Sequence, residues 1–568
     1  MKFQPDRGLA VDRGRRHFVQ GLSTASMLAS FGLLSPGLLR AAPNPAVPVL
    51  DGPNFDLTID EAAVNFTGQP RIGTAINGSI PAPLLRMREG DDITIRVTNR
   101  MSVTSSIHWH GLILPSNMDG VPGLSFAGIK PGETYVYRFK AVQSGTYWYH
   151  SHSGFQEQTG MYGAIIIEPR QADPVRYDRD YVVLLSDWSD EKPETIYARL
   201  KKFSHYYNTR ERTLGDFMTE VGENGFGKAM DNRQMWNDMR MSDRDISDVT
   251  GWTYTFLANG HTPAEGWEGV FRPGERVRLR LINGSAMTLF DVRIPGLKME
   301  VVAADGQNIR PVPGIDEIRM GIAETYDVIV QPAAGAYTLF AQAIDRSGHA
   351  RGTLTSQPGQ KAAIPALDPA PTLTHADMGM DMSGMDHSAM GHDMSQMGQP
   401  RVPVDRGPQV DMMAMAAQVR LNDPGVGLRN NGRRVLTYAD IRNLTPTIDK
   451  RPPGREIELH LTGNMSRYMW SINGVKFADA KPVVLRFGER VRITLINDTM
   501  MNHPIHLHGM WSELETGDPA YLPRKHTVIV QPGAKISYLV TADARGQWAY
   551  HCHLLYHMEG MMRRVVVA

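Results

Sequence analysis

Three stretches of the chain alternate apolar and polar positions in the same way, and each ends on asparagine. Alternation with a period of two is typical of a β-strand with one buried face, so each stretch is predicted to hold a strand that follows a glycine-containing turn. An Asn-Gly pair precedes each stretch and predicts a tight turn. The stretches are residues 85–99 (LRMREGDDITIRVTN), 271–283 (FRPGERVRLRLIN) and 485–497 (LRFGERVRITLIN), and the pairs are residues 77–78, 259–260 and 473–474.

A second element follows each of these strands. Residues 145–150 (GTYWYH) match residues 546–551 (GQWAYH), and the middle copy, residues 335–340 (GAYTLF), has lost the histidine. The copies recur at roughly 180 to 215 residues, which is the spacing of whole domains rather than of solenoid units. Short valine- and isoleucine-rich runs predict an all-β protein. We predict domains at residues 43–170, 171–357 and 416–568, with a linker at residues 358–415.

The charge balance excludes two classes of partner. The 568 residues contain 60 Lys and Arg against 60 Asp and Glu, so the formal net charge is zero. A chain without excess positive charge is not expected to bind nucleic acid or an anionic membrane surface.

The N-terminus is predicted to be a targeting segment. Residues 14–19 (GRRHFV) resemble a twin-arginine motif, a weakly apolar stretch follows at residues 21–39, and Ala41-Ala42 offers a cleavage site. We therefore predict a signal peptide at residues 1–42 and a periplasmic protein exported by the twin-arginine route. No other segment is apolar enough to span a membrane.

The only cysteine of the chain, Cys552, lies in a run of metal-ligand types. His551 and His553 flank it, His557 follows five residues on, and Met562 ten residues on. A thiolate, imidazoles and a weak axial thioether form a blue-copper centre once a second histidine comes from elsewhere. In a strand, Cys552 points to one face while its two neighbours point to the other, so they serve a different metal site. A buried structural cysteine beside surface histidines is the alternative.

Three further motifs place histidines on one face of a strand. They are residues 108–110 (HWH), 150–152 (HSH) and 503–508 (HPIHLH), and with the cysteine segment they hold 10 of the 19 histidines. Neutral imidazole suits copper, and no acidic cluster with magnesium or calcium spacing competes.

The motifs HWHG, HSH, HPIHLHG and HCHLLYHMEGMM resemble the copper-ligand signature of the multicopper oxidases, and most closely that of bacterial copper-resistance oxidases of the CopA and PcoA type. The resemblance covers nearly the whole chain after the signal peptide. It implies three cupredoxin-like Greek-key β-sandwich domains and four copper ions. The ligands lie only in the first and third domains, so the resemblance also implies that the two domains share a copper cluster at their interface.

The resemblance implies a role for each ligand position. It implies a type 1 copper at His503, Cys552 and His557 with axial Met562, a type 2 copper at His108 and His506, and two type 3 coppers at His110, His150, His152, His508, His551 and His553. Asp119 matches an acidic residue of the family near the cluster, with a turn aspartate as the alternative. Related oxidases often have a glutamate where this chain has Met558. The nearest acid is Glu559, so the proton donor stays open between Asp119 and Glu559.

Two features indicate Cu(I) as the electron donor. Met500, Met501 and Asp498 precede His503, which we expect to be exposed, and these residues are candidate ligands of substrate Cu(I). Residues 375–398 (HADMGMDMSGMDHSAMGHDMSQMG) hold seven methionines, whose thioethers prefer Cu(I). This tract has too few apolar residues to fold alone. Apolar packing under the copper loop and a disordered linker are the respective alternatives.

The function predicted from these features is oxidation of Cu(I) to Cu(II), coupled to four-electron reduction of O2 to water, in copper tolerance. A laccase-like phenol oxidase with a small organic reductant, and a periplasmic copper-binding or storage protein without turnover, are the alternatives. The expected partners are O2, the reductant and periplasmic copper-handling proteins, and we expect a monomer.

Overall fold

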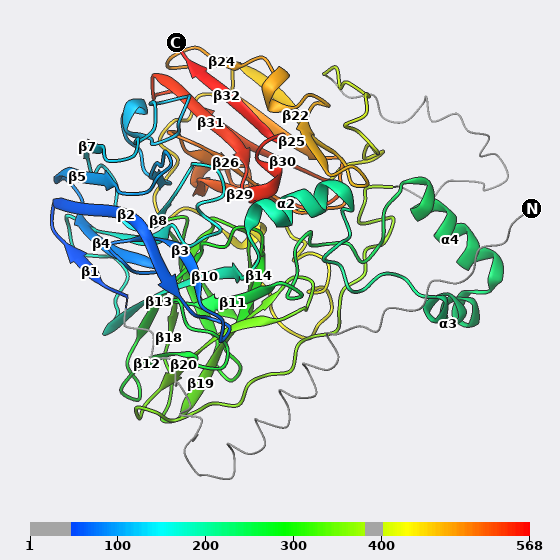
Figure 1. Cartoon of the computed structure of the whole chain (residues 1–568), viewed down its shortest axis with the longest axis horizontal. Helices are drawn as coiled ribbons and strands as arrows, with labels where there is room; N and C mark the ends of the chain where they lie inside the picture. The colour runs from blue at the N-terminus through cyan, green and yellow to red at the C-terminus, as the bar shows by residue number, and fades with distance from the viewer. Residues whose placement is uncertain (1–46, 381–401) are drawn as a thin grey trace, which may run out of the picture. The chain divides into compact units, whose positions relative to one another are not determined.

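The computed structural model describes residues 47–380 and 402–568. Its elements are mostly strands, which form six sheets (Figure 1). The predicted all-β class is confirmed. The predicted signal peptide at residues 1–42, and residues 381–398 of the methionine-rich tract at residues 375–398, lie outside the described residues.

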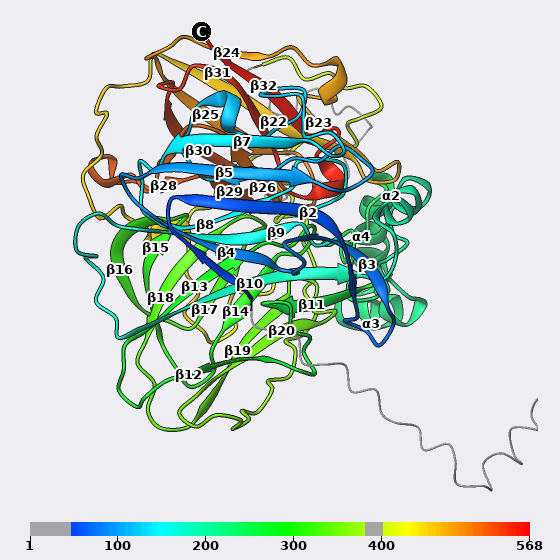
Figure 2. The same cartoon turned by 60° about the vertical axis from the view of Figure 1, so that its left-hand side comes forward.

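Residues 49–168 form two sheets, shown in blue and cyan in Figures 1 and 2. The strand order is β1–β4–β9–β8–β6 in one sheet and β3–β2–β5–β7 in the other. The strands are β1 Val49–Asp51, β2 Asn54–Val64, β3 Arg71–Ile76, β4 Ala82–Arg88, β5 Asp92–Asn99, β6 His108–His110, β7 Thr134–Lys140, β8 Gly145–His150 and β9 Tyr162–Glu168.

Residues 179–355 form two further sheets, with orders β11–β10–β13–β18–β15–β16 and β12–β20–β19–β14–β17. The strands are β10 Arg179–Ser189, β11 Tyr254–Ala258, β12 Trp267–Val270, β13 Val277–Asn283, β14 Phe290–Arg293, β15 Met299–Ala304, β16 Gln307–Ile315, β17 Glu317–Met320, β18 Thr325–Val330, β19 Ala336–Ala343 and β20 His349–Thr355.

The last two sheets come from residues 418–567. Their orders are β23–β22–β25–β30–β27–β28, with β21 paired to β30, and β24–β32–β31–β26–β29. The strands are β21 Gln418–Val419, β22 Arg455–Asn464, β23 Met469–Ile472, β24 Val483–Leu485, β25 Arg490–Asn497, β26 His503–Leu507, β27 Ser512–Leu514, β28 Arg524–Lys525, β29 Thr527–Val530, β30 Ala534–Thr541, β31 Gly546–Cys552 and β32 Met562–Val567. The domain boundaries at residues 170, 357 and 415 stay a prediction.

The predicted Asn-Gly turns are confirmed in all three copies. Each asparagine has φ near 50° and each following glycine φ between 73° and 77°. Two successive residues with positive φ define the turn that matches the twist of a hairpin. In every copy the asparagine Oδ1 accepts a backbone N–H at 2.7 or 2.8 Å, from Thr58, Leu184 and His460 in turn.

The asparagines that end the repeated strands are also used in the same way. Asn99, Asn283 and Asn497 are fully buried, and each donates from Nδ2 to two backbone carbonyls. The carbonyl partners of Asn497 belong to Met501 and Val530, at 2.7 and 2.9 Å. Each asparagine therefore fixes the loop after its strand, and in the first and third copies this loop leads into a histidine motif.

Three helices interrupt the strands between β10 and β11. They are α2 Pro193–Lys202, α3 Leu214–Asn224 and α4 Phe226–Asp238 (Figure 1). These helices lie in residues 190–250, a mainly polar segment that we call the polar insertion, and the sequence did not predict them. The signal for α3 was present, because Thr213 and Asp216 form a capping box. Over the part of the chain that the structure describes, no helix has the length and hydropathy needed to cross a membrane.

Candidate metal centre

The lone cysteine meets two histidines in the interior. Cys552 ends β31, His503 begins β26, and His557 lies in a short helical turn after β31. The Cys552 Sγ is 3.4 Å from Nδ1 of His503 and 4.0 Å from Nδ1 of His557. All three side chains are fully buried. One sulfur and two imidazole nitrogens thus converge on a single point, which is the donor set of a soft metal site.

The outer nitrogens of these two imidazoles are occupied. The hydroxyl of Thr499 lies 2.7 Å from Nε2 of His503. The Nε2 of His557 donates to Asp248 at 2.6 Å, and Tyr468 donates its hydroxyl to the same carboxylate at 3.1 Å. These contacts turn both Nδ1 atoms toward sulfur, as orienting partners do for metal ligands. Asp248 belongs to the polar insertion, and no sequence motif pointed to it.

The structure does not bring Met562 to this sulfur. In the register of β31 and β32, Met562 is directly opposite His551. Opposed residues of an antiparallel pair share a face and successive residues alternate, so Met562 projects away from the face of Cys552. It packs against Val121 and Ala549. The fully buried Met561, whose carbonyl accepts from the backbone N–H of Cys552 at 3.0 Å, is the methionine on the cysteine face.

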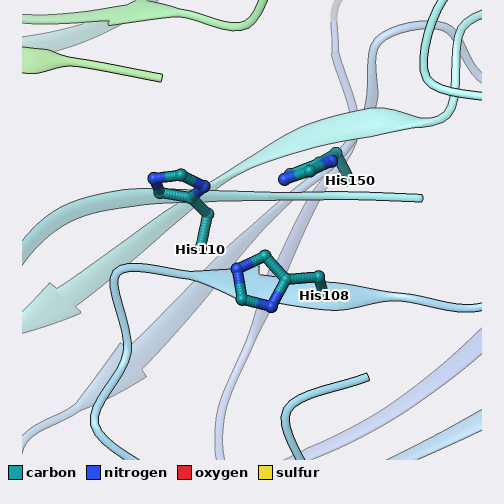
Figure 3. Close-up of side chains that lie close together, drawn as sticks. All are labelled: His108, His110 and His150. Atoms are coloured by element: carbon teal, nitrogen blue, oxygen red, sulfur yellow. The ribbon is translucent and has the colours of Figure 1, made fainter. Parts of the chain in front are cut away.

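The eight remaining motif histidines form one cluster, which we call the histidine cage. Four come from the first pair of sheets and four from the last. Figure 3 shows the rings of His108, His110 and His150 beside one another, with centroids 5.4 to 5.7 Å apart. The cage consists of His108, His110, His150, His152, His506, His508, His551 and His553.

Contacts across the cage join the two ends of the chain. The rings of His110 and His506 stack at 3.8 Å between centroids. The Nε2 of His551 is 3.3 Å from that of His152 and 3.0 Å from that of His508. Two imidazoles that bind one metal ion with bonds of about 2 Å have their nitrogens about 3 Å apart. The predicted convergence of the paired histidines across an interface is therefore present.

The Nδ1 atoms of two cage histidines contact backbone carbonyl oxygens. His108 Nδ1 donates to the carbonyl of Asp119 at 2.8 Å, and His506 Nδ1 to that of His526 at 2.6 Å. A carbonyl only accepts, so Nδ1 carries the proton and Nε2 has a free lone pair. The Nε2 atoms of His108, His150 and His506 are buried and have no partner. Unpartnered buried nitrogens are costly, and bound metal ions would satisfy them, so the residues fit copper.

Asp119 links the two halves of the cage. Its backbone carbonyl accepts from His108, while its Oδ2 is 2.9 Å from Nδ1 of His508. The side chain is buried. The structure thus brings this predicted acidic residue to the cage, although its role in proton transfer stays a prediction.

The structure brings a different glutamate to the cage than the one predicted. Glu559 is exposed and accepts a hydrogen bond from Tyr197 at 2.6 Å. Glu157 is buried, with one carboxylate oxygen 2.7 Å from Nδ1 of His150 and the other 4.0 Å from Nδ1 of His553. Burial raises the pKa of Glu157 well above its usual value, which favours the protonated form of its carboxyl group. Glu157 lies outside every histidine motif, which is why the sequence did not single it out.

The expected exposure of His503 is contradicted, and the Cu(I) candidates beside it are buried as well. Met500, Met501, Asp498 and His503 are all buried. The Asp498 carboxylate contacts Nδ1 of His460 at 2.6 Å and accepts from the backbone N–H of Ala414 at 2.8 Å. Cu(I) in solution would have to displace these partners to reach Asp498, so the loop is packed rather than open.

A cavity leads from the surface toward the cage. It has a volume of about 630 Å³ and is lined by residues of all three parts of the chain, among them Gln143, Gln307 and Trp511. A smaller chamber that shares Trp511 and Ile113 with it reaches His108, His506 and His508. This is the direction from which a small molecule such as O2 can approach.

The copper-free protein should lose stability on mild acidification. Burial lowers the pKa of His551 from 6.5 to about 4. Between these pH values the unfolded chain binds more protons than the folded one, so folding stability falls as the pH drops from 6.5 toward 4. Melting temperatures of the copper-free protein across this range would show it. The His551→Gln variant should give a shallower slope, and a melting temperature that rises on acidification would contradict the expectation.

Comparisons with known proteins agree with this geometry. Family models described as multicopper oxidase match residues 58–172, 179–358 and 450–568. A copper resistance protein A homolog of Pseudomonas syringae pv. tomato is 56% identical, over 97% of this chain and 99% of that protein. Copper resistance protein A of Escherichia coli is 54% identical, over 98% and 100%.

More distant proteins share the fold. The multicopper oxidase MmcO of Mycobacterium tuberculosis is 30% identical over 90% of this chain and 86% of its own. The crystal structure of the laccase from Botrytis aclada matches with a TM-score of 0.61 and 20% identity, over 92% of this chain and 88% of that chain. Fet3p, another multicopper oxidase, matches with a TM-score of 0.62, 19% identity and coverage of 91% and 90%. The predicted cupredoxin-type fold is confirmed.

Proposed function

Because the chain belongs to the multicopper oxidase family, we propose that it oxidises Cu(I) to Cu(II), reduces O2 to water and thereby serves copper tolerance. One observation supports the coupling of Cu(I) oxidation to O2 reduction. The residues on either side of Cys552 are His551 and His553, both members of the histidine cage. A single peptide unit on each side of Cys552 therefore connects the sulfur site to a cage histidine, which gives electrons two short covalent routes. Relatives named for copper resistance, alike over nearly the whole chain, support copper as the substrate.

The ligand assignment is part of the proposal. We assign four copper ions: a type 1 ion to His503, Cys552 and His557, a type 2 ion to His108 and His506, and two type 3 ions to His110, His150, His152, His508, His551 and His553. Met561 replaces Met562 as the axial candidate, because it lies on the face of Cys552. When bound, copper supplies one-electron transfer at the sulfur and a site for O2 in the cage.

The protein side chains exclude water, orient the copper ligands and supply protons. Burial of the cage excludes bulk water. Asp119 orients both His108, which belongs to the first pair of sheets, and His508, which belongs to the last part of the chain. Glu157 is buried with a carboxylate oxygen 2.7 Å from Nδ1 of His150, and burial favours its protonated form, so it is better placed than the exposed Glu559 to supply a proton. Burial also raises the pKa of the Cys552 thiol, so the thiolate needs a bound cation to form.

The cellular setting extends the proposal. Residues 14–19 support export by the twin-arginine route, and hence a periplasmic enzyme. In that compartment its partners would be O2, Cu(I) and copper-handling proteins, and we propose that it works as a monomer.

Oxygen uptake with alternative donors tests the substrate. We expect faster uptake with Cu(I) than with a phenol. The tract should contribute at low Cu(I) concentration, so replacing Met382, Met385, Met390, Met394 and Met397 by leucine should raise KM for Cu(I) several-fold. Residues 375–380 are kept, because Met378 is buried and the His375 ring packs on Trp236 at 4.9 Å. Leucine at the exposed Met218 and Met230 is the matched control.

Three outcomes separate the alternatives. A preference for phenol that the tract variant leaves unchanged would favour a laccase-like oxidase. Copper-loaded protein that consumes no O2 with any reductant would favour copper binding without turnover. A KM for Cu(I) that is equal in the tract variant and the control would reject the role of the tract alone.

A further inference from the structure

A ninth histidine adjoins the cage. His526 lies between β28 and β29 and is 2% exposed. Its Nδ1 is 3.1 Å from Nε2 of His110, and the two rings meet edge to face at 4.7 Å between centroids. Ring nitrogens of His110, His506 and His526 lie within 4.8 Å of one another. No copper-ligand motif of the sequence contains His526.

The other nitrogen of His526 is buried and has no partner. This Nε2 belongs to a ring that lines the small chamber reached also by His108, His506 and His508. The Nε2 atoms of His108 and His506 are unpartnered too. Buried polar atoms are nearly always paired, so unpartnered imidazole nitrogens at one chamber indicate a ligand that is held there.

The surrounding chain holds the His526 segment in place. Asp305 Oδ2 accepts from the backbone N–H groups of His526 and Thr527, both at 3.1 Å. Lys525 Nζ lies 3.1 Å from the same oxygen. The backbone carbonyl of His526 accepts from His506 Nδ1. The segment is thus fixed from both sides, as metal-ligand positions usually are.

The opposite wall leaves room for the ring. Gly111, the glycine of the HWHG motif, has φ of +82°, and a Cβ there would lie 2.4 Å from Cδ2 of His526. Any other residue at position 111 would push the imidazole out of the chamber. The two positions are therefore matched to each other.

We propose that His526 is a ninth imidazole of the cage and gives a ring nitrogen to the copper ion that His506 binds. The proposal rests on the proposed copper assignment and adds a ligand to it. Without such a bond, the His526 imidazole would be only a hydrogen-bond partner of His110 and Thr527. Its carbonyl would orient His506 in either case, so the two roles differ only in what the imidazole contributes.

The His526→Phe variant removes the ring nitrogens, while an aromatic ring and the backbone carbonyl remain. After loading with copper, we expect it to bind one ion at least about 10-fold more weakly than the unmodified protein. The EPR signal of the non-blue copper should fall or change its hyperfine splitting, while the blue absorption stays. His349→Phe is the matched control, because His349 lies in β20 outside the cage and also has a buried, unpartnered Nε2.

Equal copper content and an equal non-blue signal in His526→Phe would overturn the proposal. If the variant does not fold, pulsed EPR of the unmodified copper-loaded protein, with ¹⁵N-labelled histidine, decides. Three imidazoles on the non-blue copper support the proposal, and two overturn it. A failed Cu(I)-oxidase proposal would show instead as absent oxygen uptake in protein with intact copper signals.

Discussion

The Cys552→Ser variant is expected to lose the blue absorption completely and to slow O2 consumption by more than about 100-fold. That factor is the upper end of the effect of losing a residue that only orients a metal ligand, and Cys552 is proposed as the ligand itself. Serine has nearly the same size, but its hydroxyl does not form the thiolate on which the charge-transfer band depends. Visible and EPR spectra, copper content and oxygen uptake of the loaded protein would measure the loss.

A neighbouring variant separates this effect from general damage to the strand. Ala549→Ser also adds a buried hydroxyl to β31, three residues earlier and on the opposite face. It should keep the blue band. In Cys552→Ser the cage should still bind its copper. A blue band that persists in Cys552→Ser, or is lost equally in both variants, would contradict the assignment of the sulfur.

Replacing Lys525 by methionine should destabilise the protein by about 3–5 kcal/mol, because it leaves two buried carboxylates without their cation. Lys525 Nζ is 3.1 Å from Asp305 and 3.0 Å from Glu324, and all three side chains are fully buried. Burial alone would lower the pKa of Lys525, but the two carboxylates outweigh it and raise the pKa, so the lysine is charged at neutral pH. The midpoint of urea unfolding would measure the loss.

The control for this variant is Lys535→Met. Lys535 lies in β30 of the same part of the chain, is half-buried, and forms no ion pair within 4 Å in the described structure. Its substitution should shift the urea midpoint little. A shift as large as that of Lys525→Met would mean that loss of any lysine here destabilises the protein. The buried charge network would then not be the cause.

Much of the site was readable from the sequence, because its main ligands lie in strands. The period of two places His108 and His110 on one face, and it separates Cys552 from His551 and His553. Both arrangements are present. The three asparagines that end the repeated strands were also visible, since their role is fixed by local backbone geometry.

The remaining site residues depend on the folded loops and on packing between segments, most of which are distant in sequence. Glu157, Asp248 and His526 each reach a motif histidine through tertiary contacts and carry no motif of their own. The axial position was misplaced for a related reason. A turn separates β31 from β32, and a register change of one residue there exchanges the faces of Met561 and Met562. The packing around Asp498 comes from His460 and Ala414, far away in sequence.

The division of the cage between the two ends of the chain governs when it can exist. During synthesis, His108 leaves the ribosome long before His553 is translated. A growing chain therefore offers no complete pocket, and all eight imidazoles can surround bound metal only after the final sheet has packed against the first. Truncation anywhere upstream of residue 553 removes at least one of the eight cage histidines, so no such fragment can supply the complete set of imidazoles.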